Sequence, residues 1–158
     1  MKNNQNYQET LAEQIRKRQQ MPKDYPCCMK TDCSLFHECR HGILYRQAGG
    51  TARTLHILNP KHLSYTGDLC PHFRHKDALE NWAIGFEQGI QRMNLDEKYR
   101  FQRRCVPNYF RKTYYYELRS GKHLISPADQ ALLCQAAQDE GIALPSPFYD
   151  HVVAIPRW

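Results

Sequence analysis

Four cysteines constrain the fold of this chain more than any other feature. Cys28, Cys33 and Cys39 are spaced C-x4-C-x5-C, and Cys70 follows 31 positions later, immediately before Pro71. A structural zinc ion usually takes four ligands in a tetrahedron, and a closed shell of four leaves no position for a substrate. We therefore predict that Cys28, Cys33, Cys39 and Cys70 hold a structural zinc ion that pins the first part of the chain together.

The ligand set and the metal leave alternatives open. Cys27 could replace Cys28, and His37, His41 or His72 could replace one of the thiolates. An iron–sulfur cluster uses the same ligand type, although neither known ferredoxin spacing is present. The cysteines could also be buried free thiols, because unpaired cysteine is among the residue types most often buried.

A basic segment is the second constraint. The net charge is +6, and residues 95–125 carry eight Lys and Arg against three Asp and Glu, so most of the excess lies there. The same segment is rich in aromatic residues, which can stack on exposed bases while cations neutralise phosphates. We predict that nucleic acid or another acidic partner binds this segment, unless its charges only solvate an exposed helix. The predicted phosphate contacts are Arg103, Arg104, Arg111, Lys112, Arg119 and Lys122, and the predicted stacking residues are Tyr115 and Tyr116.

Capping-box spacings predict where two helices begin. In this motif a polar cap and a carboxylate three residues later satisfy free amides of the first turn. Thr10 with Glu13 predicts a short, frayed N-terminal helix within residues 1–24, and Asn94 with Glu97 predicts a helix that runs to about residue 105. Pro22 and Pro107 lie where these two helices should end.

Two further helices are expected from apolar periodicity and from a proline. Apolar residues at offsets of 3, 4, 7, 11 and 14 from Leu79 predict a helix that begins near Asp77. Ser126 as cap and Pro127 in the first turn predict the last helix, which Gly141 should end.

Two hairpins are expected between these helices. Residues 42–46 and 51–58 are apolar or alternating and are separated by glycines, which predicts the first hairpin. Residues 113–117 are β-branched and aromatic, so we predict that they pair with residues 122–125 across a Ser-Gly turn. The order helix, helix, hairpin, helix from residue 77 also permits a winged-helix-like module.

These elements predict the α+β class. We expect a small single domain over residues 25–158, in which a cysteine-rich, metal-bound loop and hairpin (25–74) pack on a helical half with the second hairpin (75–158). No window approaches the ~18 consecutive apolar residues of a membrane span, and residues 1–20 are polar. We therefore expect a cytoplasmic protein without a membrane partner.

The function predicted from these features is that of a non-enzymatic, nucleic-acid-associated or regulatory factor with a structural zinc site. A protein–protein adaptor that uses the apolar tail and the tyrosines is the first alternative. A thiol- or metal-dependent enzyme is the second, although no nucleotide-binding glycine loop, metalloprotease helix or paired-carboxylate signature appears, and we name no catalytic residue.

Several blocks resemble an uncharacterised family of small proteins from Bacteroidetes. The blocks are the string Cys70-Pro-His-Phe-Arg74, residues 114–121, the helix start with Ser126, Pro127 and Gln130, and the tail 148–158. The resemblance covers most of the chain from about Cys28 and implies a cytosolic setting, but no activity. It also implies that the four cysteines form one group and that Tyr115, Arg119 and Gly121 form another.

Overall fold

The computed structural model describes residues 9–48, 54–59 and 70–158. These residues contain six helices and one three-stranded antiparallel sheet, which confirms the α+β class. They divide into two compact units: the first unit joins the residues up to Gln19 with Glu80–Ile155, and the second joins Gln20–Leu79 with Pro156–Trp158. Within the described parts of the chain, no helix is long and apolar enough to cross a membrane.

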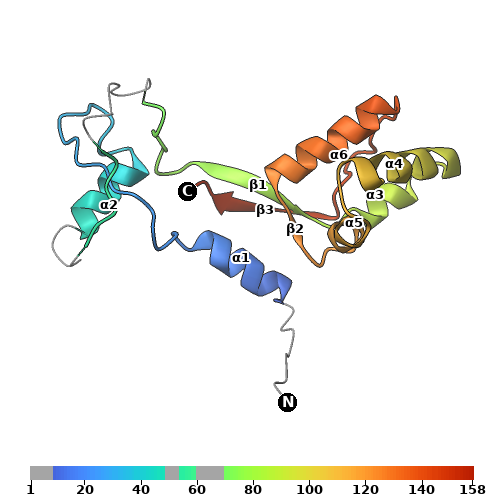
Figure 1. Cartoon of the computed structure of the whole chain (residues 1–158), viewed down its shortest axis with the longest axis horizontal. Helices are drawn as coiled ribbons and strands as arrows, with labels where there is room; N and C mark the ends of the chain where they lie inside the picture. Colours follow the sequence, from blue (N-terminus) through green and yellow to red (C-terminus); the bar gives the residue numbers. More distant parts are fainter. Residues whose placement is uncertain (1–8, 49–53, 60–69) are drawn as a thin grey trace, which may run out of the picture. The chain divides into compact units, whose positions relative to one another are not determined.

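The elements follow one another as Figure 1 labels them. The helices are α1 (Leu11–Gln19), α2 (Arg40–Ala48), α3 (Glu87–Gln91), α4 (Leu95–Asn108), α5 (Lys112–Arg119) and α6 (Pro127–Asp139). The strands are β1 (Leu79–Ile84), β2 (Leu124–Ile125) and β3 (His151–Pro156), in the sheet order β2-β1-β3.

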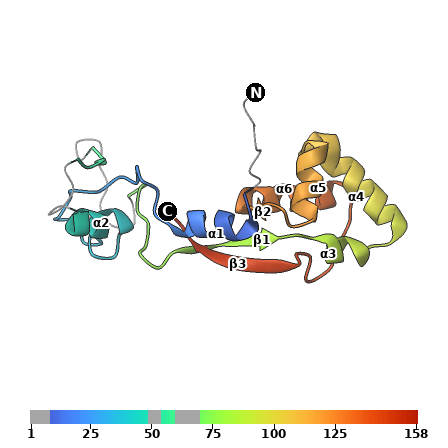
Figure 2. The ribbon, with the colours of Figure 1, turned by 90° about the horizontal axis from the view of Figure 1, so that it is seen from below.

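The sheet separates two apolar clusters of the first unit. β1 pairs antiparallel with β2, with Ala83 opposite Ile125. Ala83 packs into the main core with the helices, whereas its neighbours Trp82 and Ile84 pack in a second cluster with α1. Figure 2 shows α1 lying along the sheet. Both faces of the last part of β1, Trp82–Ile84, are therefore covered, whereas Leu79 and Asn81 are exposed.

This burial explains why the helix predicted from Asp77 is wrong. A strand covered on both faces is apolar at successive positions, so its pattern can also fit a helical stripe. Gly85 ends the strand with φ +61, and a Cβ there would lie 2.5 Å from Asp150 Oδ2. The Asp150 carboxylate accepts from the backbone N–H groups of Glu87 (3.1 Å) and Gln88 (3.0 Å), so α3 starts only after this turn.

The second predicted hairpin is wrong as well, because residues 112–119 form α5. Tyr115 and Leu118, three positions apart, are both fully buried in the main core, whereas Tyr114 and Tyr116 are exposed. Burial of one helical face therefore overrides the β-propensity of the tyrosines. No wing exists in residues 113–125, so the winged-helix-like arrangement is also wrong.

The capping predictions are confirmed. Asn94 Oδ1 accepts from Glu97 N at 2.8 Å, Glu97 Oε2 accepts from Asn94 N at 3.0 Å, and Ser126 caps α6 in the same reciprocal way. Gly141 follows α6 with φ +63. Local hydrogen bonds decide these helix ends, so a few residues of sequence suffice to predict them.

In the described residues of the second unit, the first strand of the predicted hairpin is absent. Residues 42–46 lie in the helix α2, and Gly42 lies so close to the backbone of Phe36 that a Cβ there would clash with it. Residues 51–53 of the other predicted strand lie outside the described residues. Ile57 forms only an isolated bridge with Cys27.

Candidate functional site

Backbone pairing within the second unit gathers three of the four cysteine-bearing segments. Cys39 forms an antiparallel bridge with His75, which places the segment that follows Cys70 beside it. Cys28 N donates to His41 O at 3.0 Å, so Cys28 lies at the start of α2, next to Cys39. These backbone contacts, rather than a hairpin, bring the segments of Cys28, Cys39 and Cys70 near one another.

The thiols of these cysteines interact electrostatically. Burial raises the pKa of Cys28, and the charges that Cys39, Cys70 and Cys33 carry as thiolates raise it further. The backbone N–H of Lys30 donates to the Cys28 sulfur and acts in the opposite direction. Among the described residues, however, no three Cys, His, Asp or Glu side chains stand so that they could hold a metal ion together.

Two of the alternative ligands have other surroundings. Cys27 is 2% exposed, and burial raises the pKa of its thiol. His41 is buried, its Nδ1 lies 2.6 Å from Pro26 O, and its ring stacks on Tyr25 at 4.5 Å between centroids. The carbonyl contact requires a proton on Nδ1, and burial lowers the pKa of His41. Both side chains are therefore part of the second unit's core, whereas Cys28 is the cysteine whose pKa the charges of Cys39, Cys70 and Cys33 raise.

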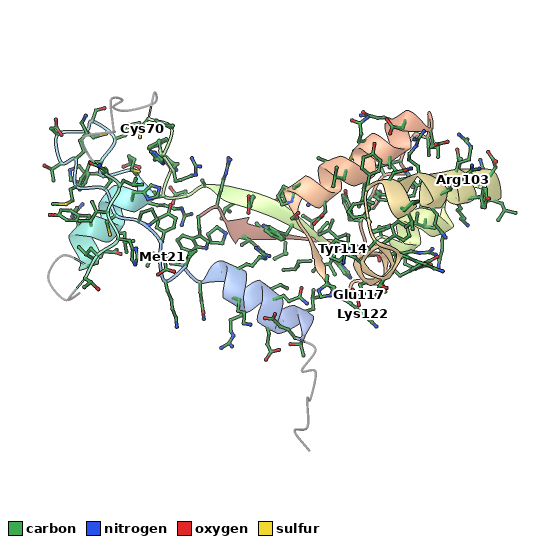
Figure 3. The ribbon with its side chains drawn as sticks, viewed as in Figure 1. Met21, Cys70, Arg103, Tyr114, Glu117 and Lys122 are labelled. Carbon is green, nitrogen blue, oxygen red and sulfur yellow. The ribbon has the colours of Figure 1, made fainter. Side chains whose placement is uncertain are left out.

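The first unit contains an open groove of about 670 Å³ along α5. Four of the eight predicted nucleic-acid residues line it: Lys112, Tyr116, Arg119 and Lys122. Glu87, Thr113, Glu117 and Ser120 complete the lining, and we call this surface the α5 groove. Figure 3 labels two of these lining residues, Glu117 and Lys122, close to each other.

Electrostatics at the start of α5 favour an anion. Arg111 is the N-cap of α5, no side chain caps the first turn, and Lys112 follows. Free amides and the positive end of the helix dipole attract negative charge. Neither cation has an ion-pair partner among the residues that the structure describes.

Three other predicted nucleic-acid residues lie outside the groove lining, are ion-paired or are buried. Arg103 is exposed on α4 and does not line the α5 groove, and Figure 3 shows it away from Glu117 and Lys122. Arg104 pairs with Glu140, at 2.9 Å from Nε to Oε1, so its charge is used within the first unit. Tyr115 is fully buried and packs edge-on against Phe86, so its ring is not available to stack on a base.

Glu87 is a groove residue that the sequence did not indicate. Arg119 donates to it twice, from Nε at 2.6 Å and from Nη2 at 2.8 Å. The two residues lie 32 positions apart, so no local pattern links them. The hydrogen bonds from Arg119 hold the pKa of Glu87 below its usual range. One predicted phosphate contact therefore already has a carboxylate partner.

This ion pair gives a stability prediction. The lowered pKa of Glu87 means that the pair stabilises the first unit above about pH 4.5 and that this contribution is lost as the pH falls through the folded-state value. Glu87 is 43% exposed, so solvent screens the pair. We expect Glu87→Gln to lower the free energy of unfolding at neutral pH by about 1 kcal/mol.

Urea unfolding would measure this effect through Trp82, the tryptophan of the first unit, in a Trp158→Phe background. The difference between Glu87→Gln and its parent should shrink as the pH falls below about 4.5, and it should vanish once the pH has passed the lowered folded-state pKa of Glu87. Glu117→Gln is the matched control, because Glu117 lines the same groove and contacts His123 at 3.5 Å rather than an arginine in the described residues. Equal losses in both variants would contradict the role of the pair.

The fold and the site define a class of protein with an α+β unit that carries a basic groove and a second unit that carries the helix α2 and a cysteine group. The chain belongs to a family of unknown function, DUF6078, which matches residues 1–155. No curated protein and no solved structure matches the chain.

Proposed function

We propose that the protein is a non-enzymatic, nucleic-acid-associated factor that contacts phosphates through the α5 groove. One observation carries the proposal: four residues selected for their chemistry along 11 positions of sequence line the same open surface. The groove holds three cations against two carboxylates, and Glu87 already neutralises Arg119. Lys112 and Lys122, with Arg111 at the start of α5, are therefore the phosphate contacts that we propose.

We also propose that Cys28, Cys33, Cys39 and Cys70 bind a structural zinc ion in the second unit. The mutual electrostatic effect of these thiols and the N–H of Lys30 on the Cys28 sulfur support this assignment. A cation among them would reverse the rise in pKa, because metal-bound thiols are deprotonated. Since no three of the described side chains hold a metal as they stand, the thiols must turn towards the ion when it binds. A cytoplasmic location and an origin in Bacteroidetes stay predictions from the sequence.

The double variant Lys112→Glu and Lys122→Glu tests the groove. Affinity for a fluorescently labelled oligonucleotide, measured by anisotropy between about 50 and 200 mM salt, should fall steeply with salt because bound cations displace counterions. The double variant should bind oligonucleotides of every base sequence more weakly than the parent. It should also reduce the slope of log K against log salt by about 2, roughly one for each lost phosphate contact.

The matched control is Lys17→Glu with Lys23→Glu, which changes the net charge equally at exposed positions outside the groove. An equal loss in this control would assign the effect to net charge rather than to the groove. Binding that hardly responds to salt would instead favour the adaptor alternative, because an apolar interface is not screened.

A further inference from the structure

An exposed tyrosine on α4 is not explained by the fold. Tyr99 is 65% exposed, against 39% for Tyr116 and 37% for Tyr114. Arg103 is exposed one helical turn later, and among the described residues no carboxylate lies within ion-pair distance of it. The opposite face of α4 carries the fully buried Phe101, so Tyr99 points away from the core. An aromatic ring and an unpaired cation therefore share one solvent-facing side of α4.

This side of α4 is linked to the α5 groove. Gln102 Nε2 donates to Tyr116 Oη at 2.8 Å, and Tyr116 lines the groove. At about 100° per residue, Tyr99 lies between Gln102, about 60° to one side, and Arg103, about 40° to the other. Around α4 the order is therefore Gln102, which contacts Tyr116 of the groove, then Tyr99 and then Arg103, and these residues mark a path that leads from the groove.

We infer that this path takes single-stranded nucleic acid and that the ring of Tyr99 stacks on a base. This inference rests on the proposed function and names the ligand class of the same surface. Aromatic side chains stack on unpaired bases of any sequence, whereas a duplex keeps its base faces covered and offers mainly phosphates to such a surface. The cations of the groove and Arg103 would then follow the backbone on both sides of the stacked base.

The experiment compares a labelled oligothymidylate of about 16 nucleotides with the same strand annealed to its complement, using the full chain. The single strand should bind more tightly. Tyr99→Ala should lower the affinity for the single strand about 5- to 150-fold, the range found when base-stacking aromatics are replaced by alanine. Tyr99→Phe should stay close to the parent, because phenylalanine keeps the ring. Leu95→Ala is the control, since Leu95 is 84% exposed on the same helix and has no ring.

The outcomes separate this inference from the proposed function. If the duplex binds as tightly as the single strand with a steep salt dependence, and Tyr99→Ala behaves like its parent, the groove binds nucleic acid but the stacking inference is overturned. If the parent protein binds neither the single strand nor the duplex, both the proposed function and the stacking inference are overturned. If Leu95→Ala and Tyr99→Ala lower the affinity equally, an apolar contact replaces stacking and the inference is also overturned. Unchanged thermal melting of the variants would show that the first unit stays folded.

Discussion

If the second unit holds the zinc ion that we propose, a chelator is expected to unfold this unit while the first unit stays folded. Structural zinc contributes about 10–16 kcal/mol to the folding of small zinc domains at neutral pH, so four ligands in a unit of this size should decide whether it folds. Cys33→Ser should have the same effect because it leaves three thiolates. Elemental analysis of the purified protein should give one zinc per chain.

The tryptophans allow the two units to be followed separately. Trp82 lies in the first unit and Trp158 in the second. Trp158 packs edge-on against Tyr25 and lies under the Arg40 guanidinium, so its fluorescence should change when the second unit unfolds. In a Trp82→Phe background, the chelator should shift the emission of Trp158 towards that of the unfolded chain. In a Trp158→Phe background, the emission of Trp82 should stay unchanged.

Cys134→Ser is the matched control for Cys33→Ser, because Cys134 is an exposed thiol of α6, outside the cysteine group. It should retain the zinc and the melting transition of the parent. If the parent protein is purified without metal and still shows the same melting transition, this result would contradict the proposed zinc site. Iron in the purified protein, together with a visible absorption band, would show that the cysteines bind an iron–sulfur cluster instead of zinc.

Replacing Tyr115 with alanine is expected to destabilise the first unit strongly, whereas the same change at Tyr116 should mainly affect binding. Tyr115 is fully buried against Phe86, and loss of a buried aromatic side chain costs about 3–5 kcal/mol. That is a large part of the 5–15 kcal/mol that stabilises a typical domain. Tyr116 is 39% exposed, so Tyr116→Ala should change the free energy of unfolding by about 0.5 kcal/mol or less.

Urea unfolding followed by Trp82, with oligonucleotide binding in parallel, would measure both effects. Tyr115→Phe is the conservative control: among the described residues, the buried Tyr115 hydroxyl has no hydrogen-bond partner, so its removal should be neutral or stabilising. A Tyr115→Ala protein with normal stability and weakened binding would contradict the buried position and return Tyr115 to the binding surface.

The sequence predicts those parts of the fold that nearby residues decide. Asn94 and Ser126 begin α4 and α6 as expected, because each cap and its carboxylate lie three positions apart. The predictions for β1 and α5 fail because tertiary burial decides these elements. Ala83 and Trp82 face different clusters, and one face of α5 is packed into the main core.

The same distinction applies to the candidate site. Charge and aromatic content are sufficient to select the segment that forms the α5 groove. They do not show which cations are already paired with carboxylates, because Glu87 and Glu140 lie 32 and 36 positions away from the arginines that they contact. They also do not show that the Tyr115 ring is buried while that of Tyr116 is exposed. This difference arises because these residues form a helix instead of the expected strand.

The side chain of Gln14 joins two segments that the ribosome makes at very different times. Its Nε2 donates to Lys122 O at 2.9 Å and its Oε1 accepts from Leu124 N at 3.1 Å, across 108 and 110 positions of sequence. During translation, α1 emerges first but has to wait for β2, while the whole stretch Gln20–Leu79 is already available. The second unit cannot be completed before the first, however, because its last residues, Pro156–Trp158, are made after Ile155, the last residue of the first unit.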